Sequence, residues 1–309
     1  MYGETTTLTT RDLDRGVTGR EINRRRLLTG MAAGGAGLAL LSPSASSQGK
    51  TQDATPDPEE ARYTAEVDAG LRYFQQRAAA QMPLFTALLA ALESDDLDTA
   101  KAAYIAARPP YEEIEVLAAS FPDTDAAIDA RPYSIDGGET SDDYVSIHRI
   151  EALLFRDADL ASAIPFARGL IESGQQLAMD LERRDAFGAT LHFEGMIALA
   201  NEVAAKKISS EEETWSDQSL LIFDHNWQGI RSQFKPFAPT LATIDGALAD
   251  DVSAAFAATF ATIAPYPPAR DGTYPPYSRV PAGDRGAIVR ASYQLRDALT
   301  RSAETLGLR

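Results

Sequence analysis

The stretch RYTAEVDAGLRYFQQRAAAQMPLFTALLAALE, residues 62–93, decides the fold class of this chain. Its apolar side chains recur at spacings of three and four residues, as Val67, Leu71 and Phe74 do. Such spacings place side chains on one face of an α-helix. The stretch therefore predicts a long amphipathic helix that packs against other helices.

The same periodicity continues to residue 306, interrupted by short breaks of Pro, Gly, Asp or Ser and without a strand pattern. Further helices are predicted over 95–119, 141–157, 160–185, 187–206, 210–234, 237–264 and 284–306. Short connections favour antiparallel neighbours, so we expect an all-α fold, an antiparallel helical bundle made of two packed four-helix bundles. The exception is the segment 264–284, whose six prolines exclude a regular helix and predict an ordered surface crossover.

The N-terminal residues resemble an export signal. Arg24, Arg25 and Arg26 precede an apolar stretch of 15 residues, which the small residues SPSASS follow. A helix that spans a bilayer needs about 20 apolar residues, so we expect a twin-arginine-type signal peptide over 1–47 and no membrane insertion after its cleavage. Residues 48–60 are polar and predict a flexible linker, which leaves 61–309 as the folded domain.

The composition restricts the possible partners. The chain carries 45 acidic and 29 basic residues, a net charge of -16. It should repel nucleic acids and anionic membranes and attract cations, although acidity can also serve only to keep an exported protein in solution. The 309 residues contain no cysteine, which excludes disulfides, thiolate metal ligands, a lipobox anchor and a cysteine nucleophile.

Residues 146–155, SIHRIEALLF, contain one of the three histidines. On a helix, His148 and Glu151 flank the apolar stripe, and Arg149 lies on the opposite face. An inward-facing imidazole and carboxylate can share a metal ion, but such a pair also arises by chance in so acidic a chain. His192 and His225 have no acid at helical spacing and are expected to be core or surface residues.

Three further acidic segments are candidates. In YEEIEVLAASF, residues 111–121, Glu112 and Glu115 share one flank of a predicted helix, as acids on solvated helix edges also do. Asp129 follows a short acidic connection, where a turn or cap would equally explain it. In ISSEEETWSD, residues 208–217, Ser210 and Glu213 fit a helix capping box.

In this order, the strings YEEIEVLAASFPDTDAAIDAR, SIHRIEALLF and ANEVAAKKISSEEETWSDQSLLIFDHNWQGI resemble the imelysin-like family, specifically the EfeO and EfeM type of iron-uptake component. The resemblance covers about residues 62–306. It implies a helical domain in the periplasm or at the cell surface that binds iron beside a membrane iron permease and a haem-dependent peroxidase. The ligands that it implies in this chain are His148, Glu151, Glu112, Glu115, Asp129 and Glu211, with Glu212 as the alternative to Glu211.

Two departures from the family pattern are visible. Ser146 stands where the family often has Gly, which raises the question of how the helix around His148 begins. The chain also has no room for the cupredoxin domain that some relatives carry, so a second metal site is not expected.

One imidazole with several carboxylates suits Fe(II) and Fe(III), while Zn²⁺, Cu²⁺ or Mn²⁺ would also bind in vitro. Because the ligands must lose their protons, we expect tighter binding as the pH rises from about 5 to about 7. The sequence thus predicts an exported, non-enzymatic component that delivers iron to a permease. Two alternatives stay open: an imelysin-type metallopeptidase, although no HExxH motif is present, and a non-catalytic helical surface or interaction protein.

Overall fold

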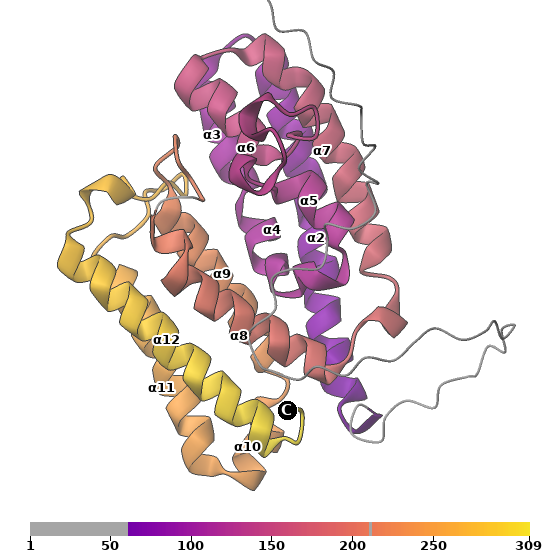
Figure 1. The fold of residues 1–309 in the computed structure, drawn as a ribbon, viewed down its shortest axis with the longest axis vertical. Helices are drawn as coiled ribbons and strands as arrows, with labels where there is room; N and C mark the ends of the chain where they lie inside the picture. Colours follow the sequence, from indigo (N-terminus) through magenta and orange to yellow (C-terminus); the bar gives the residue numbers. More distant parts are fainter. Residues whose placement is uncertain (1–60, 210–211) are drawn as a thin grey trace, which may run out of the picture. The chain divides into compact units, whose positions relative to one another are not determined.

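The computed structural model describes residues 61–209 and 212–309, and these ranges fold almost entirely as helices (Figure 1). They contain no strand, which confirms the predicted all-α class. The signal peptide and linker predicted over 1–60, and the candidate ligand Glu211, lie outside the described residues. Within the two ranges, no helix combines the length and apolar character needed to cross a bilayer.

Two sets of helices pack around a shared core. The α-helices are α2 (Thr64–Glu93), α3 (Leu97–Ala107), α4 (Pro109–Ile114), α5 (Pro122–Asp129), α6 (Ile147–Glu151), α7 (Leu160–Asp180), α8 (Ala189–Ala205), α9 (Ser219–Phe234), α10 (Ala238–Ile244), α11 (Gly246–Ile263) and α12 (Ala282–Thr305). In the first set α2 packs along α7, α3 and α4, and in the second α12 packs on α8 and α11 (Figure 1). Helix α9 packs on α8 and α11 in the second set, and the short helix α4 contacts both α2 and α9, so α4 lies where the two sets meet.

The helix predicted over 95–119 is in fact broken into three pieces. It stops before Arg108 because Pro109 and Pro110 start a new helix and have no N–H to continue the old one. From Glu115 to Ser120 the backbone tightens into a 3-10 helix. A further helix, α5, replaces the predicted connection and ends at Asp129.

Other predicted boundaries also shift. Helix α6 starts at Ile147 and continues as a π-helical turn, Ala152–Asp157, and α7 ends at Asp180 instead of near 185. The helix predicted from 210 begins only at Ser219. The one predicted over 237–264 is divided at Asp245, whose carboxylate accepts the N–H of Leu248 at 3.0 Å and so caps α11.

Two glycines let α8 and α9 press directly on the backbone that carries the acidic cluster. A Cβ atom on Gly195 would lie 3.0 Å from the carbonyl carbon of Val116 and closer still to its oxygen. On Gly229 it would lie 2.8 Å from the Cα atom of Glu113. Since real Cβ atoms do not come so close to a backbone, only glycine permits this packing, and the segment from α4 onward is fixed between the two helices.

The proline-rich crossover packs as predicted. Tyr277 is fully buried, with its ring edge-on to Phe223 at 5.5 Å between centroids, and its hydroxyl donates to the carbonyl of Ile208 at 2.8 Å. The N–H of Ser278 donates to the carboxylate of Asp217 at 2.8 Å. The crossover therefore holds both ends of the loop between α8 and α9.

Candidate metal centre

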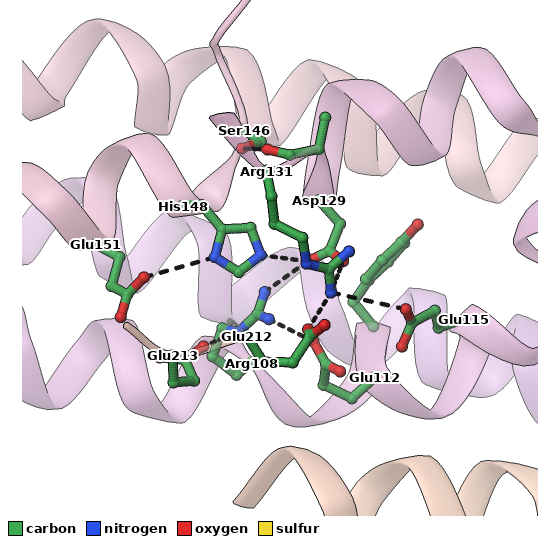
Figure 2. A network of polar contacts seen from close by, with 12 residues as sticks. Arg108, Glu112, Glu115, Asp129, Arg131, Ser146, His148, Glu151, Glu212 and Glu213 are labelled. Carbon is green, nitrogen blue, oxygen red and sulfur yellow. Dashed lines mark hydrogen bonds and ion pairs between the residues drawn. The ribbon is translucent and has the colours of Figure 1, made fainter. Parts of the chain in front are cut away.

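Four separate segments bring the predicted ligands together around His148 (Figure 2). They come from α4 with the following 3-10 helix, from the end of α5, from α6, and from the loop before α9. The described members of the predicted set are all buried: Glu112, Glu115, Asp129, His148, Glu151 and the alternative Glu212. Burial argues against the solvated-edge explanation of these acids, because an exposed edge would leave their carboxylates in water.

Asp129, His148 and Glu212 form the tightest group, with one possible ligand atom from each lying within 4.8 Å of the other two. The Nε2 atom of His148 is 3.2 Å from Oδ1 of Asp129. The Oε1 atom of Glu212 is buried and accepts no hydrogen bond from any described residue. A buried oxygen without a donor is costly, and a cation would remove that cost.

Glu151 faces the other nitrogen of the same ring. Its Oε2 lies 3.5 Å from Nδ1 of His148, while its Oε1 accepts the N–H groups of Trp215 and Ser216 at 2.8 and 2.9 Å. Glu151 therefore lies on the Nδ1 side of the ring, while Nε2 faces Asp129. This position suits a partner that orients the histidine.

Ser146 accounts for how α6 begins. Its φ of -67° is ordinary, so the position does not require Gly. Its hydroxyl donates to the carbonyl of Ala130 at 2.6 Å, which links the start of α6 to the end of α5 (Figure 2). This bond joins the backbone next to Asp129 to the helix that carries His148.

Asn226 on α9 holds the other two predicted ligands. Its Nδ2 lies 3.1 Å from Oε2 of Glu112, 3.0 Å from Oε2 of Glu115 and 2.9 Å from the carbonyl of Glu112. The two glutamates therefore share one flank, as the helical spacing predicts, and Asn226 holds them side by side.

Three cations that the ligand prediction left out are part of the same cluster. Arg108 lies 2.6 Å from Glu112, 3.0 Å from Asp129 and 2.6 Å from Glu213. The other two cations are Arg131, bound to Asp129 and Glu212, and Lys207, bound to Glu115 and Glu212. The sequence contains a signal for Arg108, because it lies four residues before Glu112, and for Arg131, because it is adjacent to the aspartate of the IDAR string.

Glu213 is also part of the cluster, and it does not cap a helix as predicted. Its carboxylate accepts from the hydroxyls of Tyr104 and Ser216 as well as from Arg108. Burial, together with the negative charge of Glu151, raises its pKa to about 8. The capping-box pattern with Ser210 therefore hid a buried acid that belongs to the site.

The residues of the cluster differ in whether they carry a proton at neutral pH. Although burial opposes their charge, the adjacent cations, chiefly Arg131, hold the pKa of Asp129 and of Glu212 below the usual values, so both are ionised. Burial also opposes the charge of His148, but Asp129 outweighs it and raises the pKa of His148 to about 9. In the absence of metal, the imidazole is therefore protonated at neutral pH.

The described cluster carries more acid than base. Its six buried carboxylates belong to Glu112, Glu115, Asp129, Glu151, Glu212 and Glu213. Against them stand the three cations, so three formal negative charges remain when His148 is neutral and every carboxylate is ionised. Without metal at neutral pH, the protons on His148 and Glu213 offset part of this surplus, and a bound cation would take their place. Such a surplus of hard oxygen ligands with one imidazole suits a multiply charged cation such as iron or manganese.

The two other histidines lie in different surroundings. His192 is buried in α8 with Nδ1 2.8 Å from the carbonyl of Gly188, which confirms it as a core residue. His225 is partly buried, and its Nδ1 lies 2.9 Å from Oε1 of Glu113. That contact joins α9 to α4, so no spacing within one helix could reveal it.

Comparison with known proteins agrees with the family resemblance of the three sequence strings. The family model described as Imelysin matches residues 67–303. The iron uptake system component EfeM of Pseudomonas syringae pv. syringae (strain B728a) is 33% identical over 221 residues, 71% of this chain and 76% of the relative. An Efem/EfeO family lipoprotein of Staphylococcus haemolyticus (strain JCSC1435) is 31% identical over 222 residues, 70% of this chain and 74% of the relative. Another, from Staphylococcus aureus (strain USA300), is 30% identical over 219 residues, 69% and 75% of the two chains.

Proposed function

This chain belongs to the imelysin family, and we propose that it is an exported iron-binding component of an iron uptake system. It captures Fe(II) or Fe(III) at the cluster around His148 and delivers the ion to a membrane permease. The permease and a haem-dependent peroxidase are proposed as partners from the resemblance to the EfeO and EfeM type. The relatives include an iron uptake system component and lipoproteins, which supports a role in uptake outside the cytoplasm.

The group formed by Asp129, His148 and Glu212 is the observation that supports this proposal most strongly. Two ionised carboxylates and an imidazole nitrogen converge there, and one buried oxygen of Glu212 has no donor among the described residues. Glu112 and Glu115 supply further carboxylates to the cluster, and Glu151 orients the histidine ring. Zn²⁺, Cu²⁺ and Mn²⁺ should also bind in vitro, because the ligand set alone does not exclude them.

A peptidase function fits the site less well. The cavity that reaches His148 and Glu151 measures about 60 Å³, enough for an ion with few waters. Ligand pockets for larger molecules usually measure about 300–1,000 Å³. The chain also lacks a HExxH motif, which supplies two histidines and a general base in many zinc peptidases.

Isothermal titration tests the proposal directly. We expect the wild type to bind Fe(II) under anaerobic conditions, and His148→Ala and Glu212→Gln each to weaken binding by about 100-fold or more. The first removes the imidazole, and the second removes the carboxylate charge and one of its two oxygens. The matched controls are His225→Ala and Glu113→Gln, which change a histidine and a buried glutamate outside the group. Their iron affinity should stay at the wild-type value.

Equal iron affinity in His148→Ala and the wild type would refute the metal centre. A peptidase assay on the same proteins tests the metallopeptidase alternative. Peptide hydrolysis that disappears in His148→Ala and persists in His225→Ala would restore the enzyme hypothesis.

A further inference from the structure

The three cations of the cluster differ in how deeply they are enclosed. The side chains of Arg108 and Lys207 have 0% exposure, and each is bound to acids of the cluster alone. Arg131 retains 13% exposure. It lines the cavity of about 60 Å³ together with His148 and Glu151. Arg131 is therefore the one of these three cations that lies beside the cavity.

Arg131 also occupies the position between two candidate ligands. Its Nη2 lies 3.1 Å from Oδ2 of Asp129 and forms a closer ion pair with Oε2 of Glu212 (Figure 2). A metal ion bound to both carboxylates would lie about 2.0–2.2 Å from their oxygens. An ion bound to these same two oxygens would overlap with the guanidinium, and an ion bound to the other oxygen of each carboxylate would lie beside its full positive charge.

We propose that Arg131 is a displaceable counter-cation that holds the place of the metal and leaves through the cavity when a multiply charged ion arrives. This inference rests on the proposed iron-binding function. Arg108 and Lys207 stay in place, because their side chains have 0% exposure and neither lines the cavity. The incoming ion must compete with a full positive charge, which excludes monovalent ions and favours Fe(II) and Fe(III) through their higher charge.

The same exchange would assist release. When the ion leaves, the guanidinium can return to Asp129 and Glu212, so the acids are not left without a counter-charge. Arg131 would thus weaken binding and speed dissociation, as delivery to a membrane partner requires. A residue that merely supported the ligands would have the opposite effect on affinity.

The first test is Arg131→Gln, which removes the charge and keeps a hydrogen-bond donor. We expect this variant to bind Fe(II) about tenfold more tightly than the wild type in anaerobic titration and to release it more slowly to a chelator. The control is Arg149→Gln, an arginine on α6 whose guanidinium donates to the carbonyl of Glu139 outside the cluster. It should match the wild type, and unchanged or weaker binding by Arg131→Gln would overturn the inference.

The second test uses the wild-type protein and does not depend on the variant folding. Phenylglyoxal modifies accessible arginines, and mass spectrometry locates the modified sites. We expect Arg131 to be modified faster with Fe(II) or redox-inert Ga(III) bound than without metal, while Arg108 stays protected in both states. Equal or slower modification of Arg131 with metal bound would refute displacement.

The two proposals fail in distinguishable ways. If the wild type binds iron and Arg131→Gln binds it no better, the counter-cation inference is wrong and the proposed function stands. If neither protein binds iron, both are wrong. If only Arg131→Gln binds, the inference is supported, and the wild type would need a partner to move Arg131.

Discussion

Glu112 and Glu113 are neighbours on α4, and both are buried, yet they belong to opposite kinds of environment. Glu113 accepts from the hydroxyl of Tyr73, lies 3.0 Å from Arg77 and contacts His225. One carboxylate there meets two basic residues and a hydroxyl. Glu112 instead joins the cluster around His148, where carboxylates outnumber their permanent cations.

The comparison shows that burial and a nearby histidine do not identify a metal centre. Both regions contain a buried glutamate in contact with a histidine Nδ1 atom. What separates them is the balance of charge and the buried oxygen of Glu212, which has no donor among the residues that the structure describes. A surplus of acid calls for a cation from solution, whereas a balanced ion pair does not.

The largest expected effect comes from Gly229→Ala, which would disturb both regions at once. The new Cβ would lie 2.8 Å from the Cα atom of Glu113, so α9 and α4 must separate. We expect a loss of about 3 kcal/mol in the free energy of unfolding, since overpacking against a backbone cannot be relieved by a rotamer change. Urea unfolding followed by circular dichroism measures it.

Gly169→Ala in α7 is the matched control, because nothing lies within 4 Å of its added Cβ. It should leave stability unchanged or raise it by about 0.5–1 kcal/mol through better helix propensity. Similar behaviour of the two variants would contradict the close packing of α9 on α4.

The pH dependence of binding is the next largest effect. Because His148 has a pKa of about 9 in the absence of metal, it must lose a proton to bind iron. Affinity should therefore rise about tenfold per pH unit between pH 6.5 and 8.5, which extends the range expected from the sequence. Titration in buffers of different ionisation enthalpy measures the released proton, and a flat profile would contradict His148 as a ligand.

The raised pKa of His148 has the opposite effect on the stability of the metal-free protein, which should fall as the pH rises. The pKa of His148 is raised from 6.5 to about 9 in the folded protein, so its pairing with Asp129 is fully present below pH 6.5. That contribution is lost as the pH rises through 9, and it amounts to at most about 3 kcal/mol. Urea unfolding measures the free energy of unfolding of the wild type and of His148→Gln. The difference between the two proteins should be smaller at pH 9.5 than at pH 6.

A smaller loss of iron affinity is expected from Glu151→Gln. The amide oxygen can still accept from Trp215 and Ser216, but the amide nitrogen would face Nδ1 of His148 and misorient the ring. Loss of such an orienting partner weakens metal binding by about 10- to 100-fold.

Glu113→Gln changes the same kind of contact in the other region, toward His225, and should leave iron affinity unchanged. Titration of the two variants with Fe(II) compares the regions directly. Equal iron affinities would mean that Glu151 has no particular role in orienting His148.

Much of the site could be predicted from the sequence because several of its signals are local. Helical spacing places His148 and Glu151 on an inward-facing side of their helix, and it places Glu112 and Glu115 on one flank of theirs. Asp129 and the acidic run that contains Glu212 were indicated only by the resemblance of the ordered strings to the imelysin-like family. In contrast, Lys207 was missed, since nothing near it in the chain indicates that it meets Glu115 across 92 residues.

Breaks in the helices were the least predictable feature of the fold. The periodicity around Arg108 continues across Pro109, although the chain starts a new helix there. The shift to a 3-10 helix at Glu115 coincides with the close approach of Gly195 to Val116, which is a contact between distant segments. The local apolar periodicity predicts that helices form, whereas contacts between distant segments determine where they break or bend.

By itself, the sequence determined the all-helical class, the inward direction of the His148 segment and the kinds of ligand available. Only the tertiary structure decided that Glu112 and Glu113 face different clusters, that Glu151 contacts Nδ1 of His148, and that Arg131 pairs with both Asp129 and Glu212. The physical reason is that amphipathic periodicity acts over one or two helical turns. The balance of buried charge is instead a sum over side chains that only folding brings together.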